Sequence, residues 1–308
     1  MKTTKASPCS RAAQCSLCGL ILATLPLGAA TVLLNETFSD GLRNGTRTPG
    51  VDDILPVSGW YATTPGSVSI RNNALSGTTS NSAMNAYFSA VTLGVGESLT
   101  LTLNYTATSD VTNDNGGLGF GLFSSGGVAS RTTADSQDGS AGSRIDDKGI
   151  FVRMNPGKFI GGGSFEMRTT NDNASRTDLF AWATPILSSG QNASSIANTS
   201  NTATFKITRD AADSLSVNIV ITGDVKNPVP TAYLYTRTIA STDPAFTTVF
   251  DEVAFNWNLG TAGGSITLDN INVTYSGTLP GVPEPATVAL FTGLATAAAV
   301  CALRRHRK

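Results

Sequence analysis

Apolar and polar residues alternate one by one along several stretches of this chain. Within residues 97–105, Leu99, Leu101 and Leu103 fall on one side, and the serine, threonines and asparagine at 98, 100, 102 and 104 fall on the other. Successive side chains of a β-strand point to opposite faces, so a period of two predicts a strand with one buried and one solvated face. This period, rather than the 3.6-residue period of a helix, sets the fold class.

The same alternation recurs along most of the chain. Residues 203–208 and 214–222 repeat it, and the polar stretch 209–213 between them predicts the turn of a β-hairpin. Further strands are predicted at 67–72, 87–93, 118–123, 149–154, 164–169, 232–238 and 247–257. Long polar loops are predicted at 109–117, 124–148, 170–178 and 188–202, where function is expected.

The last predicted strand, 265–275, contains a break in its alternation. Ile266 and Leu268 share one face, but the next apolar set begins at Ile271. One extra residue at Asp269-Asn270 restores the phase, which predicts a β-bulge. Ten or more such strands predict an all-β fold, a two-sheet antiparallel β-sandwich over residues 31–278.

Charge and reactive residues exclude several functions. Charged residues make up only 14% of the chain, and residues 31–282 carry 14 basic against 21 acidic residues, a net charge of −7. Such a body attracts nucleic acid poorly, so no nucleic-acid partner is expected. All four cysteines (Cys9, Cys15, Cys18, Cys301) and the single His306 lie outside this body. Cysteine–histidine and serine–histidine catalysis are therefore excluded for it.

The N-terminus has the layout of a secretory signal peptide, residues 1–30. Lys2, Lys5 and Arg11 precede an apolar stretch, 15–27. Small residues follow, and signal peptidase is expected to cleave after Ala30.

The C-terminus, residues 279–308, has three ordered parts. Val282, Pro283, Glu284 and Pro285 form a rigid tetrapeptide that a helix cannot continue through. Residues 286–303 follow without a charge, long enough to cross a thin bilayer as one helix. The chain then closes on a basic tail at 304–308, whose positive residues hold it on the cytoplasmic side: Arg304, Arg305, Arg307 and Lys308. On these properties alone, the segment could equally be an ordinary membrane anchor.

The three parts together resemble the PEP-CTERM sorting signal over about the last 27 residues. Exosortases, which are membrane-embedded enzymes of bacteria that make extracellular polysaccharide, read such signals. The resemblance implies that Pro283, Glu284 and Pro285 are the recognition element. It also implies that the helix anchors the protein in the inner membrane only transiently.

The body carries a second resemblance, borne by the order of its motifs. Five motifs together resemble the concanavalin/laminin-G-like jelly roll, over most of residues 33–275: GWY at 59–61, YFSAVTLGVGESLTLTLNY, GLGFGLF, DDKGIFVRMNPG and ITLDNINVTY. That family includes lectins, glucanases and domains without an assigned activity. The glucanases place Glu-x-Asp-x-x-Glu on one strand face, and this pattern is absent here. Asp251 and Glu252 are adjacent and are expected on opposite faces, so no catalytic residue is assigned and the body is not expected to be an enzyme.

Three aromatic residues are candidates for stacking on a sugar: Trp60, Tyr61 and Trp182. Core packing is the role that the sequence favours for these aromatics, because large aromatics dominate β-sandwich cores, and Trp257 is assigned to the core outright. Residues 110–115 offer oxygen ligands that suit calcium, although a solvated polar turn has the same composition. No other metal or cofactor is expected.

The sequence thus predicts an exported protein of the cell envelope or extracellular matrix. Its expected partners are signal peptidase, an exosortase, the membrane and an extracellular polysaccharide. Binding of a glycan or a structural role is expected. The alternatives are a glycan-cleaving enzyme with an unrecognised site and an inert surface component.

Overall fold

The computed structural model describes the following residues, all within the compact unit Ala29–Val282: 30–43, 59–77, 82–108, 117–135, 147–154, 165–170, 180, 186–189, 194–195, 199–223, 225–226, 233–244, 246–257 and 264–277. Among them there is no α-helix, only the 3₁₀ turns η1 (Pro65–Ser67) and η2 (Val128–Ser130). No helix in these ranges is long and apolar enough to cross a membrane. The signal peptide and the segment 279–308 lie outside the described residues.

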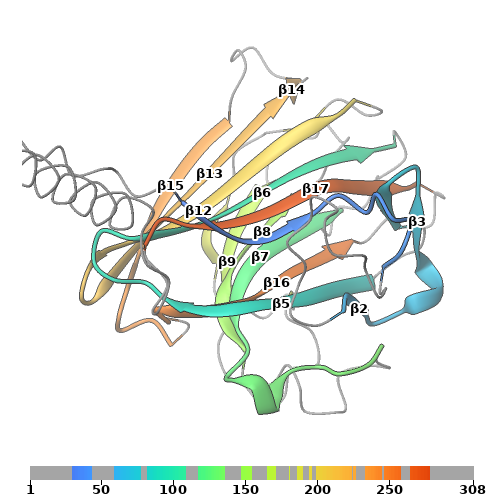
Figure 1. The fold of residues 1–308 in the computed structure, drawn as a ribbon. Coiled ribbons are helices and arrows are strands. Elements are labelled where there is room, and N and C mark those ends of the chain that lie inside the picture. Colours follow the sequence, from blue (N-terminus) through green and yellow to red (C-terminus); the bar gives the residue numbers. More distant parts are fainter. Residues whose placement is uncertain are drawn as a thin grey trace, which may run out of the picture. The chain divides into compact units, whose positions relative to one another are not determined.

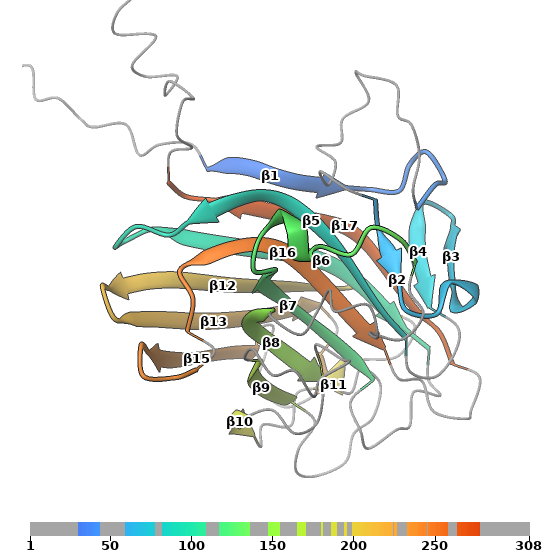
Figure 2. The same cartoon turned by 90° about the horizontal axis from the view of Figure 1, so that it is seen from below.

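Two antiparallel sheets form the body, as predicted, and Figures 1 and 2 show them as two layers. The larger sheet has the order β15-β13-β12-β6-β17-β4-β3, with β1 also paired to β17. Its strands are β1 (Thr31–Glu36), β3 (Val68–Arg71), β4 (Ala74–Gly77), β6 (Ser98–Ala107), β12 (Asn201–Ala211), β13 (Ser214–Gly223), β15 (Tyr233–Ala240) and β17 (Ile266–Tyr275).

The second sheet has seven strands in the order β10-β9-β8-β7-β16-β5-β2. Its strands are β2 (Tyr61–Ala62), β5 (Ser82–Thr92), β7 (Leu118–Ser124), β8 (Lys148–Met154), β9 (Phe165–Thr170), β10 (Ile186–Ser189) and β16 (Val249–Trp257). A separate two-stranded pair joins β11 (Ser194–Ser195) and β14 (Val225–Lys226). The predicted loop 188–202 is therefore wrong in part, since it contains the end of β10, all of β11 and the start of β12.

The core between the sheets follows the alternation of the sequence. Leu99, Leu101 and Leu103 of β6 are fully buried, whereas the intervening Thr100 and Thr102 are partly exposed. The predicted hairpin forms from β12 and β13 and turns at residues 212–213. Period-two alternation thus located the central strands of the larger sheet correctly.

The predicted bulge in β17 is confirmed. Asp269 pairs with Asn104 and Asn272 with Thr102, so β17 uses one more residue than β6 over this stretch. Asn270 takes up the change with a φ of 48°, a left-handed conformation that asparagine tolerates. On the other side of β17, β4 pairs before the bulge and β1 after it.

The seven-stranded sheet departs from the predicted pattern, because its central strands are buried on both faces. In β7, the inner Leu118, Phe120 and Leu122 pack in the main core, and Gly119 and Phe123 on the other face are buried as well. We call the face turned away from the larger sheet the outer face. The expectation of a solvated outer face is wrong for β5, β7, β8 and β16.

Candidate functional site

Polar side chains on the outer face meet where β5, β16 and β2 lie side by side. In β5, Met84, Ala86 and Phe88 belong to the main core, so Asn85 and Tyr87 alternate with them onto the outer face. In the neighbouring strands, the register aligns Tyr61 with Asn85, and Glu252 with Tyr87.

An amide and a carboxylate lie at the centre of this group. Asn85 Nδ2 donates to Glu252 Oε1 at 2.7 Å, and the two residues are 1% and 0% exposed. Burying a carboxylate is costly unless it is hydrogen-bonded, and such groups concentrate at functional sites. Tyr61, in contrast, is only partly buried.

The hydroxyl of Tyr87 stays neutral at ordinary pH. Burial raises the pKa of Tyr87 above its usual value of 10, and the negative charges of Glu252 and Asp147 raise it further. The hydroxyl oxygen accepts a hydrogen bond from the backbone N–H of Thr132 at 2.9 Å, which acts in the opposite direction. A neutral phenol keeps its proton for donation next to the carboxylates.

Residues 125–135, which we call the strap, follow β7 and cross these strands. In Figures 1 and 2 this green segment runs from the end of β7 past β16 and β5 toward β2. The sequence predicted this stretch as part of a functional loop. Its contacts determine how the polar group is covered.

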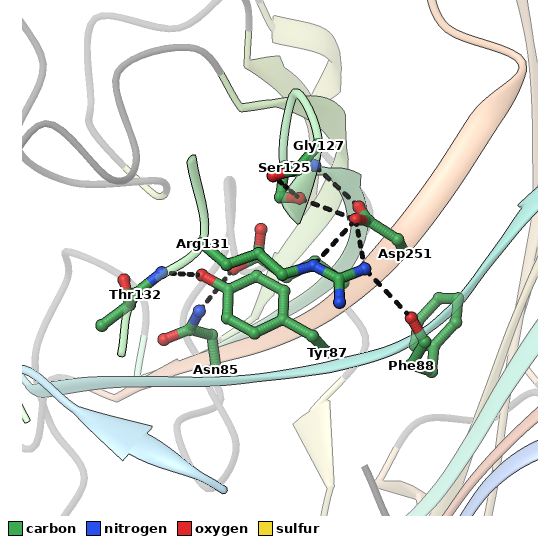
Figure 3. A network of polar contacts seen from close by, with 9 residues as sticks. Asn85, Tyr87, Phe88, Ser125, Gly127, Arg131, Thr132 and Asp251 are labelled. Carbon is green, nitrogen blue, oxygen red and sulfur yellow. Dashed lines mark hydrogen bonds and ion pairs between the residues drawn. The ribbon is translucent and has the colours of Figure 1, made fainter. Parts of the chain in front are cut away.

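The first anchor of the strap is Asp251 of β16 (Figure 3). Asp251 accepts from the N–H and the hydroxyl of Ser125 at 2.8 and 2.7 Å, and from Arg131 Nη2 at 2.7 Å. Arg131 also donates to the carbonyl oxygen of Phe88 at 3.3 Å, and its guanidinium carbon lies 5.1 Å from the Tyr87 ring centroid. The Arg131 and Asp251 side chains are only 13% and 5% exposed.

The last anchor is Asp135, at the edge of the sheet. Arg43 Nη1 donates to Asp135 Oδ1 at 2.7 Å, and the N–H of Ala62 donates to the same oxygen at 2.9 Å. Burial acts to raise the pKa of Asp135, but these hydrogen bonds and the Arg43 charge lower it below the ordinary carboxyl value. The Arg43 and Asp135 side chains are 19% and 29% exposed, so this anchor is more accessible to solvent than the Asp251 anchor.

An aromatic cluster covers the neighbouring part of the outer face. Phe123, Phe151, Phe180 and Ala254 pack together, with ring centroids of Phe151 and Phe180 5.0 Å apart. Gly121 lies under it, where a Cβ would approach the carbonyl oxygen of Ile150 to 2.5 Å. The glycines of GLGFGLF thus allow close approach of β8, and they signal a face that is covered.

The predicted aromatic site residues separate in the structure. Trp60 as a sugar-stacking residue is wrong, because its ring is fully buried and its Nε1 donates to Glu36 Oε2 at 3.0 Å. Tyr61 lies partly exposed beside the polar group, and Trp182 lies outside the described residues. Trp257 is in the core, as predicted. Ala30 is exposed directly before β1.

The remaining predicted site residues fall outside the described part of the chain. These are the sorting motif Val282, Pro283, Glu284 and Pro285, the basic residues Arg304, Arg305, Arg307 and Lys308, and the polar loop 110–115. Within the described ranges, no group of three or more histidine, cysteine or acidic residues is arranged to hold a metal ion.

The predicted opposition of Asp251 and Glu252 is wrong. Phe250 and Val253 both belong to the core, so two consecutive residues between them turn away from it. The register between β16 and β5 shifts at this point, between Phe250 and Glu252. The shift turns both carboxylates to the outer face, where Asp251 binds the strap and Glu252 binds Asn85, which strict alternation could not predict.

Comparisons with known proteins find similarity only at the level of structure. No protein-family model and no curated protein matches the sequence. Peanut lectin with a 9-residue peptide superposes with a TM-score of 0.44 at 9% identity, over 80% of this chain and 97% of that one. Lectin II from Ulex europaeus gives 0.42 at 13% identity, over 73% and 96%. The metal-free carbohydrate recognition domain of Emp46p gives 0.42 at 10% identity, over 71% and 89%. Similarity at this level does not indicate what this chain binds.

Proposed function

We propose that the chain is an exported glycan-binding β-sandwich with a concanavalin/laminin-G-like body. The observation that carries this proposal is the alignment of Tyr61, partly exposed, with Asn85, which is bonded to Glu252 on the same face. A sugar ring offers an apolar face and a rim of hydroxyls. An aromatic ring next to a few fixed polar groups matches both.

Each residue has a distinct role in this proposal. The Tyr61 ring stacks on the apolar face of a sugar at the edge of the sheet. The Asn85 amide and the Glu252 carboxylate hydrogen-bond its hydroxyls, the carboxylate as an acceptor only. Tyr87 stays protonated and serves as a donor.

A glycan array probed with the protein, followed by titration of the best glycan, tests this function. Tyr61→Ala is expected to weaken binding about tenfold through loss of the aromatic contact. Tyr61→Phe is the matched control, because it keeps the ring, and it should bind within about twofold of the parent. Equal affinity of the parent and Tyr61→Ala would contradict the site, and an array without any bound glycan would favour an inert surface component.

Glycan cleavage is a second candidate, favoured by one observation. The charges of Glu252 and Asp147 both act on the phenol of Tyr87, so two carboxylates lie within reach of this one residue of the outer face. Glycosidases use such pairs as acid and base or nucleophile. We expect no release of reducing sugar from common β-glucans. Release that disappears in Glu252→Gln would establish the enzyme instead.

We also propose that the protein is sorted to the cell envelope or extracellular matrix by an exosortase. The ordered parts 282–285, 286–303 and 304–308 support this route, as does β1, which begins directly after the predicted cleavage residue Ala30.

Glu284→Ala is expected to leave the protein at full length in the membrane, whereas Pro280→Ala, outside the motif, should be processed normally. The measurement is the mass of the C-terminal peptide, with and without the exosortase. An intact basic tail in both strains would make the segment an ordinary anchor.

A further inference from the structure

The strap is bonded to the three strands that surround the polar pair proposed to bind the glycan. Its anchors follow in chain order on β16, β5 and β2: Asp251 holds Ser125 and Arg131, Tyr87 holds Thr132, and Ala62 holds Asp135. Asn85 and Glu252 belong to the same strands and are almost completely buried. A glycan can therefore reach them only if the cover over these strands moves, and among the described residues the strap is the segment bonded beside them.

The two ends of the strap are held unequally. The Asp251 end combines three donor groups from Ser125 and Arg131 in a site where the carboxylate is 5% exposed. The Asp135 end rests on a pair with 19% and 29% exposed side chains and one backbone hydrogen bond. Water competes for exposed ion pairs, so these contribute little to stability, whereas a dry and fully bonded carboxylate resists separation.

We infer that residues 132–135 form a gate over the Asn85–Glu252 pair, hinged at the Asp251 anchor and latched by Asp135. When Asp135 leaves Arg43 and Ala62, the Thr132 N–H leaves Tyr87, and the outer face opens from the side of Tyr61. The Asp251 anchor keeps residues 125–131 in place, so the opening is local. The role of the gate in glycan entry rests on the proposed function, whereas its opening follows from the contacts of the strap alone.

The first measurement needs no glycan. Amide hydrogen exchange of Thr132 and modification of Glu252 by a water-soluble carbodiimide, located by mass spectrometry, report opening of the gate and access to the carboxylate. Asp135→Ala is expected to speed both by up to about fivefold, the range that an exposed ion pair contributes. Asp210→Asn is the matched control: this carboxylate accepts from Ser216 at the surface of the other sheet, and both rates should stay unchanged.

The second measurement is the association rate with the glycan found on the array. Asp135→Ala should raise it by the same factor as the opening rate, since the gate limits entry. Unchanged exchange and labelling in Asp135→Ala overturn the gate, and so does faster opening without faster association. If no glycan binds but Glu252 labelling still rises, the gate stands and the glycan-binding function fails.

Discussion

At the scale of single residues, hydrogen-bond partners separate two tryptophans that look alike in the sequence. Trp60 and Trp257 are both buried in the core. Trp60 Nε1 donates to the carboxylate of Glu36, which also accepts from the N–H of Phe38 at 2.7 Å. Trp257 Nε1, among the described residues, has no hydrogen-bond partner. The sequence assigned Trp257 to the core outright but left Trp60 between the core and a sugar site, and the distant partner Glu36 could not be predicted.

Replacing each tryptophan by phenylalanine is therefore expected to have unequal effects on stability. Trp60→Phe removes a donor from a buried carboxylate, which costs about 2–3 kcal/mol in addition to the lost packing. Trp257→Phe loses packing without a hydrogen bond, so its loss should be smaller by about that amount. Urea unfolding followed by far-UV circular dichroism measures both. Equal losses would mean that the Glu36 hydrogen bond contributes nothing to stability.

Asp135 gives a pH dependence to one end of the strap. Its pKa lies below the ordinary 3.8, so its ionised form is favoured in the folded state. The stabilisation is present above the ordinary carboxyl pKa and is lost as pH falls through the lowered value. Exchange of the Thr132 amide, corrected for intrinsic rate, should be constant from about pH 7 to 5 and rise below about pH 4. In Asp135→Asn this rise should be absent, and a rise near pH 6 would contradict the assignment.

At the scale of elements, the strands that follow simple alternation were predicted well, and those that break it were not. β6, β12 and β13 have one buried and one partly exposed face, which the alternation of apolar and polar residues in the sequence indicates directly. β5 and β7 are covered on both faces, and their small residues do not show which side is buried. β1, β4 and β10 were missed, as were the two-residue strands β2, β11 and β14. The Asn72-Asn73 pair could have predicted β4. Both residues are left-handed, with φ of 52° and 57°, and asparagine pairs of this kind form the two-residue turn of a β-hairpin, here between β3 and β4.

The covered outer face makes Gly121 intolerant of a side chain. A Cβ at this position would lie 2.5 Å from the carbonyl oxygen of Ile150, which belongs to the backbone and cannot swing away. Gly121→Ala should therefore cost more than about 2 kcal/mol of unfolding free energy. Gly66→Ala is the control, because nothing lies within 4 Å of its Cβ position and the effect should stay within about 0.5 kcal/mol. Denaturant midpoints of the two variants compare them directly.

At the scale of the whole molecule, the two-sheet antiparallel sandwich was predictable, because the period of two fixes which residues must face a common core. The strand order was not, since pairing partners far apart in the chain leave no local trace. β17 illustrates this: it inserts between β6 on one side and β4 and β1 on the other. Likewise, the polar group at Asn85 and Glu252 joins residues 167 positions apart.

A truncation pair tests how far the sandwich depends on β17. A chain ending at Gly277 keeps all described strands and should unfold cooperatively in urea. A chain ending at Gly264 lacks five core residues of β17, which leaves β1 without a partner and separates β6 from β4 in the larger sheet, so it should show no cooperative transition. Tryptophan fluorescence and circular dichroism follow both chains. A sharp transition in the shorter chain would show that β17 is dispensable.

The central position of β17 also determines when the larger sheet can be completed during synthesis. A ribosome produces the N-terminus first, so β1, β4 and β6 appear long before residues 266–275, the strand they share. Until then the larger sheet has a gap in its middle: the β12–β13 hairpin can form and pair with β6, but β6 has no strand on its other side and β1 has no partner. Loop closure between such distant partners is slow, which favours a chain that stays open during synthesis. Among the described strands β17 is made last, so the larger sheet is complete only once residues 266–275 have been added.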